Sequence, residues 1–398
     1  MITRLSKFFF YTFGSILTGL LLGCATPSGS VTSPGSVALD SRADEQMLWQ
    51  KSEQEQRAFE SNGLIYRDQV LEDYLNRIAL KLQPKPADLK IRIKVIKNTH
   101  LNAFAYPNGI IYINSGLLTR MDNEAQLAAV LAHEITHCTR RHALRALKKA
   151  KDQPALLKAV QHALSETRGL QDMARFMGIS GAIATFSGYI RELETEADQV
   201  GLELMAAAGY DPREALHIFD QMVSEIEHEG FKEPILGSHP TVGQRVAYLQ
   251  NLIDAQYPQK ESATQNSEIF LANLARLFLN NAEMDIRQGR FQMARIAVEK
   301  HLRVQPDDSR AYFLLGEIYR QRQQDDDMLK ALTYYDRALH LDPNFAAAYK
   351  GIGLIHYKEG RRTLARKFFK SCMRLAPDSP DKAYIQGYLK QCMLSEEG

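Results

Sequence analysis

Three prolines near the C-terminus stand at nearly equal intervals. Pro306, Pro343 and Pro377 are separated by 37 and 34 residues. A repeat of this length accommodates two helices joined by a turn, and one such hairpin cannot bury its own apolar face. Consecutive hairpins must therefore stack and share a continuous core. This spacing predicts that the C-terminal part of the chain is an all-α array of helical hairpins.

Residues of fixed types recur at the same positions within these intervals. In the last copy, Tyr349, Gly353, Ala365 and Phe369 occupy positions four, eight, twenty and twenty-four. The middle copy keeps the pattern with three inserted residues, and the first copy is weaker. Small residues at these positions let the two helices of a hairpin approach closely. The pattern is that of tetratricopeptide repeats, which we expect over residues 268–398.

The N-terminus has the features of a bacterial signal peptide. Two basic residues precede an apolar run over residues 8–22, which is too short for a spanning helix. The run ends in Leu21-Leu22-Gly23-Cys24, which resembles the lipobox whose cysteine becomes the lipidated first residue. We therefore expect a signal peptide over residues 1–23, a lipid anchor on Cys24 and a flexible tether over residues 24–43.

The charge balance excludes one class of partner, and the positions of two cysteines exclude one disulfide. The chain has 49 Lys and Arg and 47 Asp and Glu, and without Arg4 and Lys7 of the signal peptide it would carry 47 of each. Binding to nucleic acid by counterion release needs a basic surface, so no nucleic-acid partner is expected. Cys372 and Cys392 fall about 14 Å apart along neighbouring predicted helices, so we expect no disulfide between them.

The segment between the tether and the repeats, residues 44–258, is predicted to be an α+β domain that is mainly helical with a small β-sheet. The expected helices are two within 44–83, one at 125–147, one at 191–208 and one from Asp211-Pro212 onward. The expected strands are one at Ile91–Val95 and a hairpin at 102–114. A polar linker is expected at 257–266. Residues 173–190 fit either a lid over a cleft or an ordinary buried helix.

The motif His133-Glu134-Ile135-Thr136-His137 predicts the chemistry of this domain. Two histidines at positions i and i+4 of one helix lie on the same face, at a separation that suits one zinc ion. The glutamate between them can act as a general base on a water molecule. The motif therefore predicts a zinc hydrolase, and it needs a third ligand from elsewhere in the chain.

The third ligand has several candidates. His142, five residues after His137, is expected about 140° away around the same helix, which makes it a poor ligand. The downstream helix offers two acidic pairs at i, i+4 spacing, Glu192 with Glu196 and Glu194 with Asp198. Spacing alone does not choose between these two pairs.

Four motifs occur in an order and spacing that are found in a known family. They are residues 102–109, residues 133–142, residues 194–198, and Ser238-His239-Pro240 with Arg245. The chain resembles the zinc metalloproteases that include the CAAX prenyl protease, in a lipid-anchored form that ends in a tetratricopeptide array. The resemblance implies an α+β, mainly helical zincin-type protease domain with a small β-sheet, followed by an all-α array.

The resemblance also selects among the metal ligands. It implies one zinc ion per chain, bound by the two motif histidines and Glu194. Asp198 and Arg245 would lie beside these ligands and orient them. Glu134 would deprotonate the attacking water and later protonate the leaving amine.

Two further assignments rest on the resemblance alone. His239 is expected to approach the zinc, either as a plug in the fourth position at rest or as a donor to the oxyanion. Asn102, Ala103, Phe104 and Ala105 are expected to form an edge strand that holds a substrate in extended form.

The function that this resemblance implies is that of a zinc endopeptidase of the bacterial periplasm. We expect a lipid to anchor it to the outer membrane. Its expected substrates are misfolded or stalled outer-membrane proteins, with the β-barrel assembly machinery as a partner of the repeats. An alternative is a tetratricopeptide chaperone or adaptor with a restrained or vestigial protease site. The intact Glu134 argues against a vestigial site, because such a site has no need of its base. A general peptidase without β-barrel clients would differ only in its substrates.

Overall fold

The computed structural model describes residues 41–84, 89–152, 191–229, 242–257 and 264–394. Several sequence-based expectations concern residues outside these ranges: the signal peptide, Cys24 and most of the tether, the segment 173–190, and His239. Within the described ranges, no helix has the length and apolar character needed to cross a membrane.

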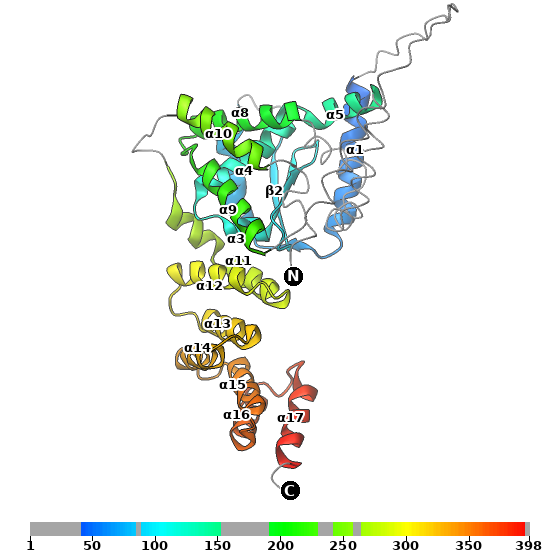
Figure 1. Cartoon of the computed structure of the whole chain (residues 1–398). Coiled ribbons are helices and arrows are strands. Elements are labelled where there is room, and N and C mark those ends of the chain that lie inside the picture. The colour runs from blue at the N-terminus through cyan, green and yellow to red at the C-terminus, as the bar shows by residue number, and fades with distance from the viewer. Residues whose placement is uncertain (1–40, 85–88, 153–190, 230–241, 258–263, 395–398) are drawn as a thin grey trace, which may run out of the picture. The chain divides into compact units, whose positions relative to one another are not determined.

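A four-stranded sheet lies beside the helices of the N-terminal part (Figure 1). Its order is β1-β2-β4-β3, in which β2 and β4 run parallel while β1–β2 and β3–β4 are antiparallel. The strands are β1 Ile65–Tyr66, β2 Arg92–Ile96, β3 Ala103–Ala105 and β4 Ile110–Asn114. The predicted strand and the predicted hairpin are both confirmed, and β3 stands at the end of the sheet order.

Helices of the N-terminal part pack around α4, which carries the His-Glu-x-x-His motif. Helix α4 contacts α2, α8, α9 and β3, and its residues Leu127, Ala128 and Leu131 are fully buried. Its first residue, Glu124, accepts hydrogen bonds from the hydroxyls of Tyr74 and Tyr210. The helices are α1 Ser41–Glu60, α2 Gln69–Leu82, α3 Ser115–Arg120, α4 Glu124–Thr139, α5 His142–Asp152, α8 Arg191–Ala207, α9 Glu214–Glu229 and α10 Val242–Gln256.

Two predicted helix boundaries were wrong. The helix expected over residues 125–147 is interrupted, because Arg141 adopts a left-handed conformation with φ 53° between α4 and α5. The Nε of Arg141 donates a hydrogen bond to the carboxylate of Glu45 at 2.6 Å. Pro212 does not begin a helix, since residues 211–213 form a turn in which the Asp211 carboxylate accepts from the Arg213 amide before α9 starts.

The C-terminal part is a succession of helical hairpins, as predicted (Figure 1). Its helices are α11 Ser267–Arg287, α12 Phe291–Val304, α13 Ser309–Arg322, α14 Asp327–Leu341, α15 Ala346–Lys358, α16 Arg362–Leu375 and α17 Lys382–Leu394. A Cβ on Gly353 would lie 2.7 Å from the Phe369 ring, so this glycine lets α15 and α16 pack closely. The side chains of Cys372 and Cys392 are buried in one small apolar core.

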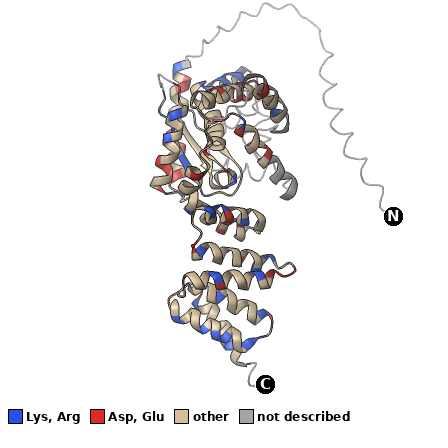
Figure 2. Cartoon of the chain, turned by 90° about the vertical axis from the view of Figure 1, so that its left-hand side faces the viewer, with Lys and Arg blue, Asp and Glu red and all other residues tan. Residues whose placement is uncertain are grey.

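Basic side chains gather in the last repeats (Figure 2). Helix α16 contains no acidic residue. Its basic residues are Arg362, Arg366, Lys367, Lys370 and Arg374.

The first hairpin of the array shares the hydrophobic core of the N-terminal part. Lys300 of α12 is buried, and its Nζ donates to three carbonyl oxygens at and just after the end of α3. The predicted polar linker also contacts the N-terminal part, because Thr264 bridges to Tyr210 and the Asn266 amide donates to Glu124. The array is therefore fixed to the motif-bearing part by both polar and apolar contacts.

Candidate metal centre

Two helices supply the three side chains of the candidate metal centre. Helix α4 presents His133 and His137 one turn apart on the same face, as the i, i+4 spacing requires. Helix α8 brings Glu194 to them from the opposite side. Gly201 permits this approach, since a Cβ there would lie only 3.3 Å from the backbone nitrogen of His133.

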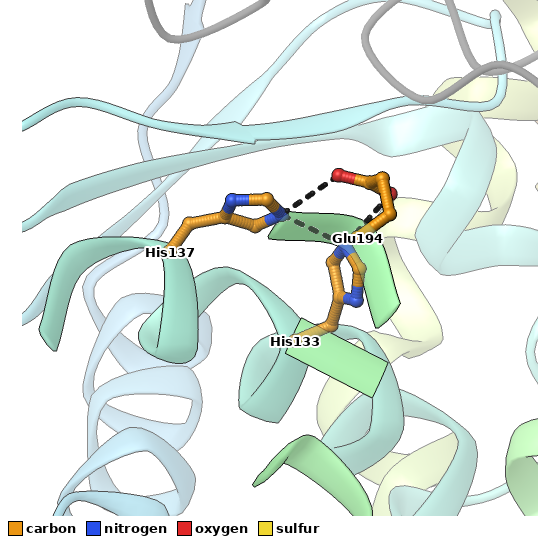
Figure 3. A group of neighbouring side chains, drawn as sticks. All are labelled: His133, His137 and Glu194. Carbon is orange, nitrogen blue, oxygen red and sulfur yellow. Dashed lines mark hydrogen bonds and ion pairs between the residues drawn. The ribbon is translucent and has the colours of Figure 1, made fainter. Parts of the chain in front are cut away.

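The donor atoms of these three residues converge on one point (Figure 3). The Nε2 atoms of His133 and His137 are 3.0 Å apart, and Glu194 oxygens lie 3.6 Å from the first and 3.2 Å from the second. Ligand atoms around a tetrahedral zinc ion with bonds of about 2.0–2.1 Å are separated by about 3.3 Å. The three residues are buried, and their spacing fits a zinc ion.

The chemistry of the donor set also fits a cation. Each histidine has its Nδ1 in contact with another side chain, so both Nε2 atoms remain directed at each other and at the carboxylate. Two imidazole nitrogens and a carboxylate that face one another at these distances form a donor set that a single cation can join. The site therefore suits neutral histidine ligands with an anionic glutamate.

Asp198 and Arg245 hold the first of these histidines. The Asp198 carboxylate lies 3.0 Å from Nδ1 of His133 and accepts two hydrogen bonds from Arg245, at 2.6 and 2.9 Å. Arg245 also lies 3.3 Å from Glu194 and stacks over the ring of Phe219. Burial raises the pKa of Asp198. The interactions with Arg245 and His133 lower this pKa by a larger amount, so it lies below its ordinary value. Asp198 therefore stays ionised beside the histidine.

His142 contacts the second histidine. Its side chain is fully buried, and its Nδ1 lies 3.0 Å from Nδ1 of His137. On its other side, Nε2 is 3.5 Å from the carboxylate of Glu196. Burial, together with the neighbouring ring of His137, lowers the pKa of His142 to about 2, so its ring is neutral.

Glu134 lies beside a small apolar cavity. The residue is buried, and the cavity of about 50 Å³ is lined by both His133 and Glu134. The rest of the lining comes from β3 and from helices α3, α4, α8, α9 and α10. It includes Ala103, Leu117, Ala129, Val130, Gly201, Met205, Ile218, Phe219 and Leu249.

The structure separates the acidic residues that spacing left equivalent. Glu194 faces the histidines, whereas the side chain of Glu192 is 74% exposed and lies near Lys149. Glu196 faces His142 and Arg145 of α5.

The four residues of the expected substrate strand, Asn102 to Ala105, are buried, and three of them form β3.

Sequence reasoning missed the place of His142, because it assumed an unbroken helix. The left-handed residue at the break is an arginine, a type that carries no signal for this conformation. The left-handed turn at Arg141, between α4 and α5, brings His142 back to His137.

Two regions of the chain match known protein families. Residues 66–253 match the family described as peptidase family M48, and residues 279–327 and 326–380 match the tetratricopeptide repeat.

Two relatives illustrate the range of similar proteins. The chain is 27% identical over 228 residues to the beta-barrel assembly-enhancing protease of Escherichia coli K12, an alignment covering 55% of this chain and 46% of that protein. It is 30% identical over 179 residues to the mitochondrial metalloendopeptidase OMA1 of Schizosaccharomyces pombe, covering 44% of this chain and 51% of that protein. The chain thus matches about half the length of these relatives.

Proposed function

We propose that this chain, whose residues 66–253 belong to peptidase family M48, is a zinc-dependent endopeptidase. The observation that carries the proposal is the convergence of His133, His137 and Glu194 on one buried point, with matching distances. Two histidines and a carboxylate leave the fourth position of a tetrahedral zinc site for water or substrate, as catalytic sites require.

The residues of the chain have distinct tasks in peptide hydrolysis. A bound zinc ion would act as a Lewis acid on the reacting groups. Glu134 takes a proton from the attacking water while the water oxygen bonds to the peptide carbon. The same side chain then delivers the proton to the nitrogen as the carbon–nitrogen bond breaks. Asp198 and Arg245 keep His133 in the orientation that binds metal.

The substrate is proposed to be an extended, unfolded polypeptide. The contact of strand β3 with α4, the helix that carries both histidines, supports the proposal that Asn102 to Ala105 hold the extended chain near the metal centre. The cavity beside Glu134 would accept an apolar side chain next to the cleaved bond. His239 remains proposed as a group that approaches the zinc, either as a resting plug or as an oxyanion donor.

The proposed clients are misfolded or stalled outer-membrane proteins. The name of the Escherichia coli relative supports this class, and repeats of the tetratricopeptide type support contacts with other proteins, here the β-barrel assembly machinery. Incubation of the zinc-loaded chain with an unfolded outer-membrane β-barrel and with an unfolded polypeptide of similar length from another fold tests the client class. Faster cleavage of the barrel polypeptide is expected. Equal rates would indicate a general peptidase.

The proposed location is the periplasm, with a lipid anchor on Cys24 to the outer membrane. The lipobox-like sequence at residues 21–24 supports this proposal. Two or more acyl chains give stable membrane attachment. Cell fractionation of Cys24→Ala tests it, and the variant should leave the membrane fraction or remain unprocessed. Normal processing with unchanged membrane association would refute the anchor.

A further inference from the structure

The break between α4 and α5 gives the metal centre a second supporting side chain. After the left-handed Arg141, the chain turns so that the ring of His142 meets the ring of His137 edge to face, with 4.8 Å between their centroids. Figure 3 shows His137 with Nε2 toward Glu194 and Nδ1 on the far side of the ring. That far nitrogen is the atom that lies 3.0 Å from Nδ1 of His142.

The hydrogen-bonding roles of the two rings follow from metal binding. A histidine that binds metal through Nε2 carries its hydrogen on Nδ1 and needs an acceptor there. Nδ1 of His142 is the atom in that place, so the lone pair of His142 lies on Nδ1 and its hydrogen on Nε2. The carboxylate of Glu196 lies 3.5 Å from that Nε2, close enough to attract its hydrogen electrostatically although the two atoms are not hydrogen-bonded.

Glu196 is held in this place from outside. Arg145 of α5 donates to its carboxylate at 2.6 Å, and Arg140 lies 3.8 Å from it. Glu196 is therefore the outer end of a chain of contacts that runs from His137 through His142 to the protein surface. His133 has a similar chain of contacts, in which its Nδ1 meets Asp198 and Asp198 accepts hydrogen bonds from Arg245.

We propose that His142 and Glu196 are positioning residues that fix the ring orientation and tautomer of His137 for zinc binding. This inference rests on the proposed zinc site and adds to it two residues that do not touch the metal. Each histidine ligand then has its own acceptor, supplied for His133 by α8 and for His137 by α5. Loss of such an acceptor typically weakens metal affinity about 10- to 100-fold.

Zinc affinity, measured by competition with a chromophoric chelator, tests the proposal on the whole chain. His142→Leu removes the acceptor and should raise the zinc Kd about 10- to 100-fold. His142→Asn places its Oδ1 where Nδ1 of the histidine lies, and should keep the Kd within about threefold of wild type. The absorption spectrum of the Co²⁺-substituted protein should change in the Leu variant and not in the Asn variant.

Glu196→Gln provides a second variant that leaves the interior intact, because the Glu196 side chain is 29% exposed. It should raise the zinc Kd several-fold, while Glu192→Gln on the exposed face of the same helix should not change it. A wild-type Kd in both His142→Leu and Glu196→Gln, or an equal loss in His142→Asn and His142→Leu, would overturn the proposal. Failure of the wild-type chain to bind zinc would instead refute the proposed function.

Discussion

Asp198 lies between Arg245 and His133 and contacts both at hydrogen-bond distance. Its Oδ1 is 3.0 Å from Nδ1 of the histidine and 2.6 Å from Nη2 of the arginine. All three side chains are buried. The arginine neutralises a carboxylate that would otherwise be costly to bury, and the carboxylate fixes the histidine ring.

The first prediction concerns this carboxylate. Asp198→Asn should weaken zinc binding about 10- to 100-fold, because the amide is a poorer acceptor for the Nδ1 hydrogen of His133. The zinc Kd is measured by chelator competition. Glu192→Asn is the matched control, since its side chain is on the same helix and 74% exposed. Equal zinc affinity in Asp198→Asn and wild type would contradict the role assigned to Asp198.

The second prediction separates the two acidic pairs of α8. Glu194→Ala should abolish tight zinc binding, because it removes one of three protein ligands. Glu192→Ala should bind one zinc ion per chain like wild type. Metal analysis after exhaustive dialysis measures both. Full zinc in Glu194→Ala together with its loss in Glu192→Ala would reverse the choice of ligand.

The third prediction concerns the contact between the first repeat and the motif-bearing part. Lys300→Met should lower the free energy of unfolding by about 2 kcal/mol or more, because the buried carbonyl oxygens of Arg120, at the end of α3, and of Met121 lose their donor. Urea denaturation of the metal-free protein measures this loss. Arg303→Met, on the exposed side of α12, is the control. Equal unfolding midpoints for the two variants would show that the Lys300 contacts contribute nothing.

The fourth prediction concerns acid stability of the repeats. Burial raises the pKa of Glu317. Hydrogen bonds from Arg320 and Tyr335, together with the charge of Arg320, lower this pKa by a larger amount, so it lies below its ordinary value. A carboxyl with a lowered folded-state pKa stabilises the fold above its unfolded pKa of about 4.3. That stabilisation disappears as the pH falls through the folded-state pKa.

Thermal unfolding measured between pH 7 and pH 3 tests this. Glu317→Gln should unfold at lower temperature than wild type at pH 7, and the difference should shrink toward pH 3. Glu299→Gln, whose side chain is 45% exposed on α12, should follow wild type at every pH. A difference between Glu317→Gln and wild type that does not change with pH would contradict the linkage.

Local patterns were enough to predict much of this architecture. The 34-residue period and the i, i+4 histidines depend on residues near one another in sequence, and the expected α+β domain followed by an all-α array is confirmed. The choice between Glu192 and Glu194 could not be made from spacing, because both occupy equivalent i, i+4 pairs. It depends on which face of α8 meets α4, and Gly201 marks that contact.

Features that depend on packing between distant elements were not predictable. The left-handed Arg141 has no sequence signal, so the contact of His142 with His137 was missed. Lys300 lies in a helix whose sequence is that of an ordinary repeat. Only its burial against α3 shows that it connects the repeats to the N-terminal part.

Glu134 is proposed to perform the proton transfer in peptide hydrolysis at this metal centre. The direct test compares zinc-loaded wild type with zinc-loaded Glu134→Gln on an unfolded outer-membrane polypeptide, with zinc content measured in the same samples. We predict one zinc ion per chain in both proteins and cleavage about 10²- to 10⁴-fold slower in the variant. Equal cleavage by the two proteins, or no cleavage by wild type carrying its zinc, would contradict it, and the second result would favour a chaperone or adaptor.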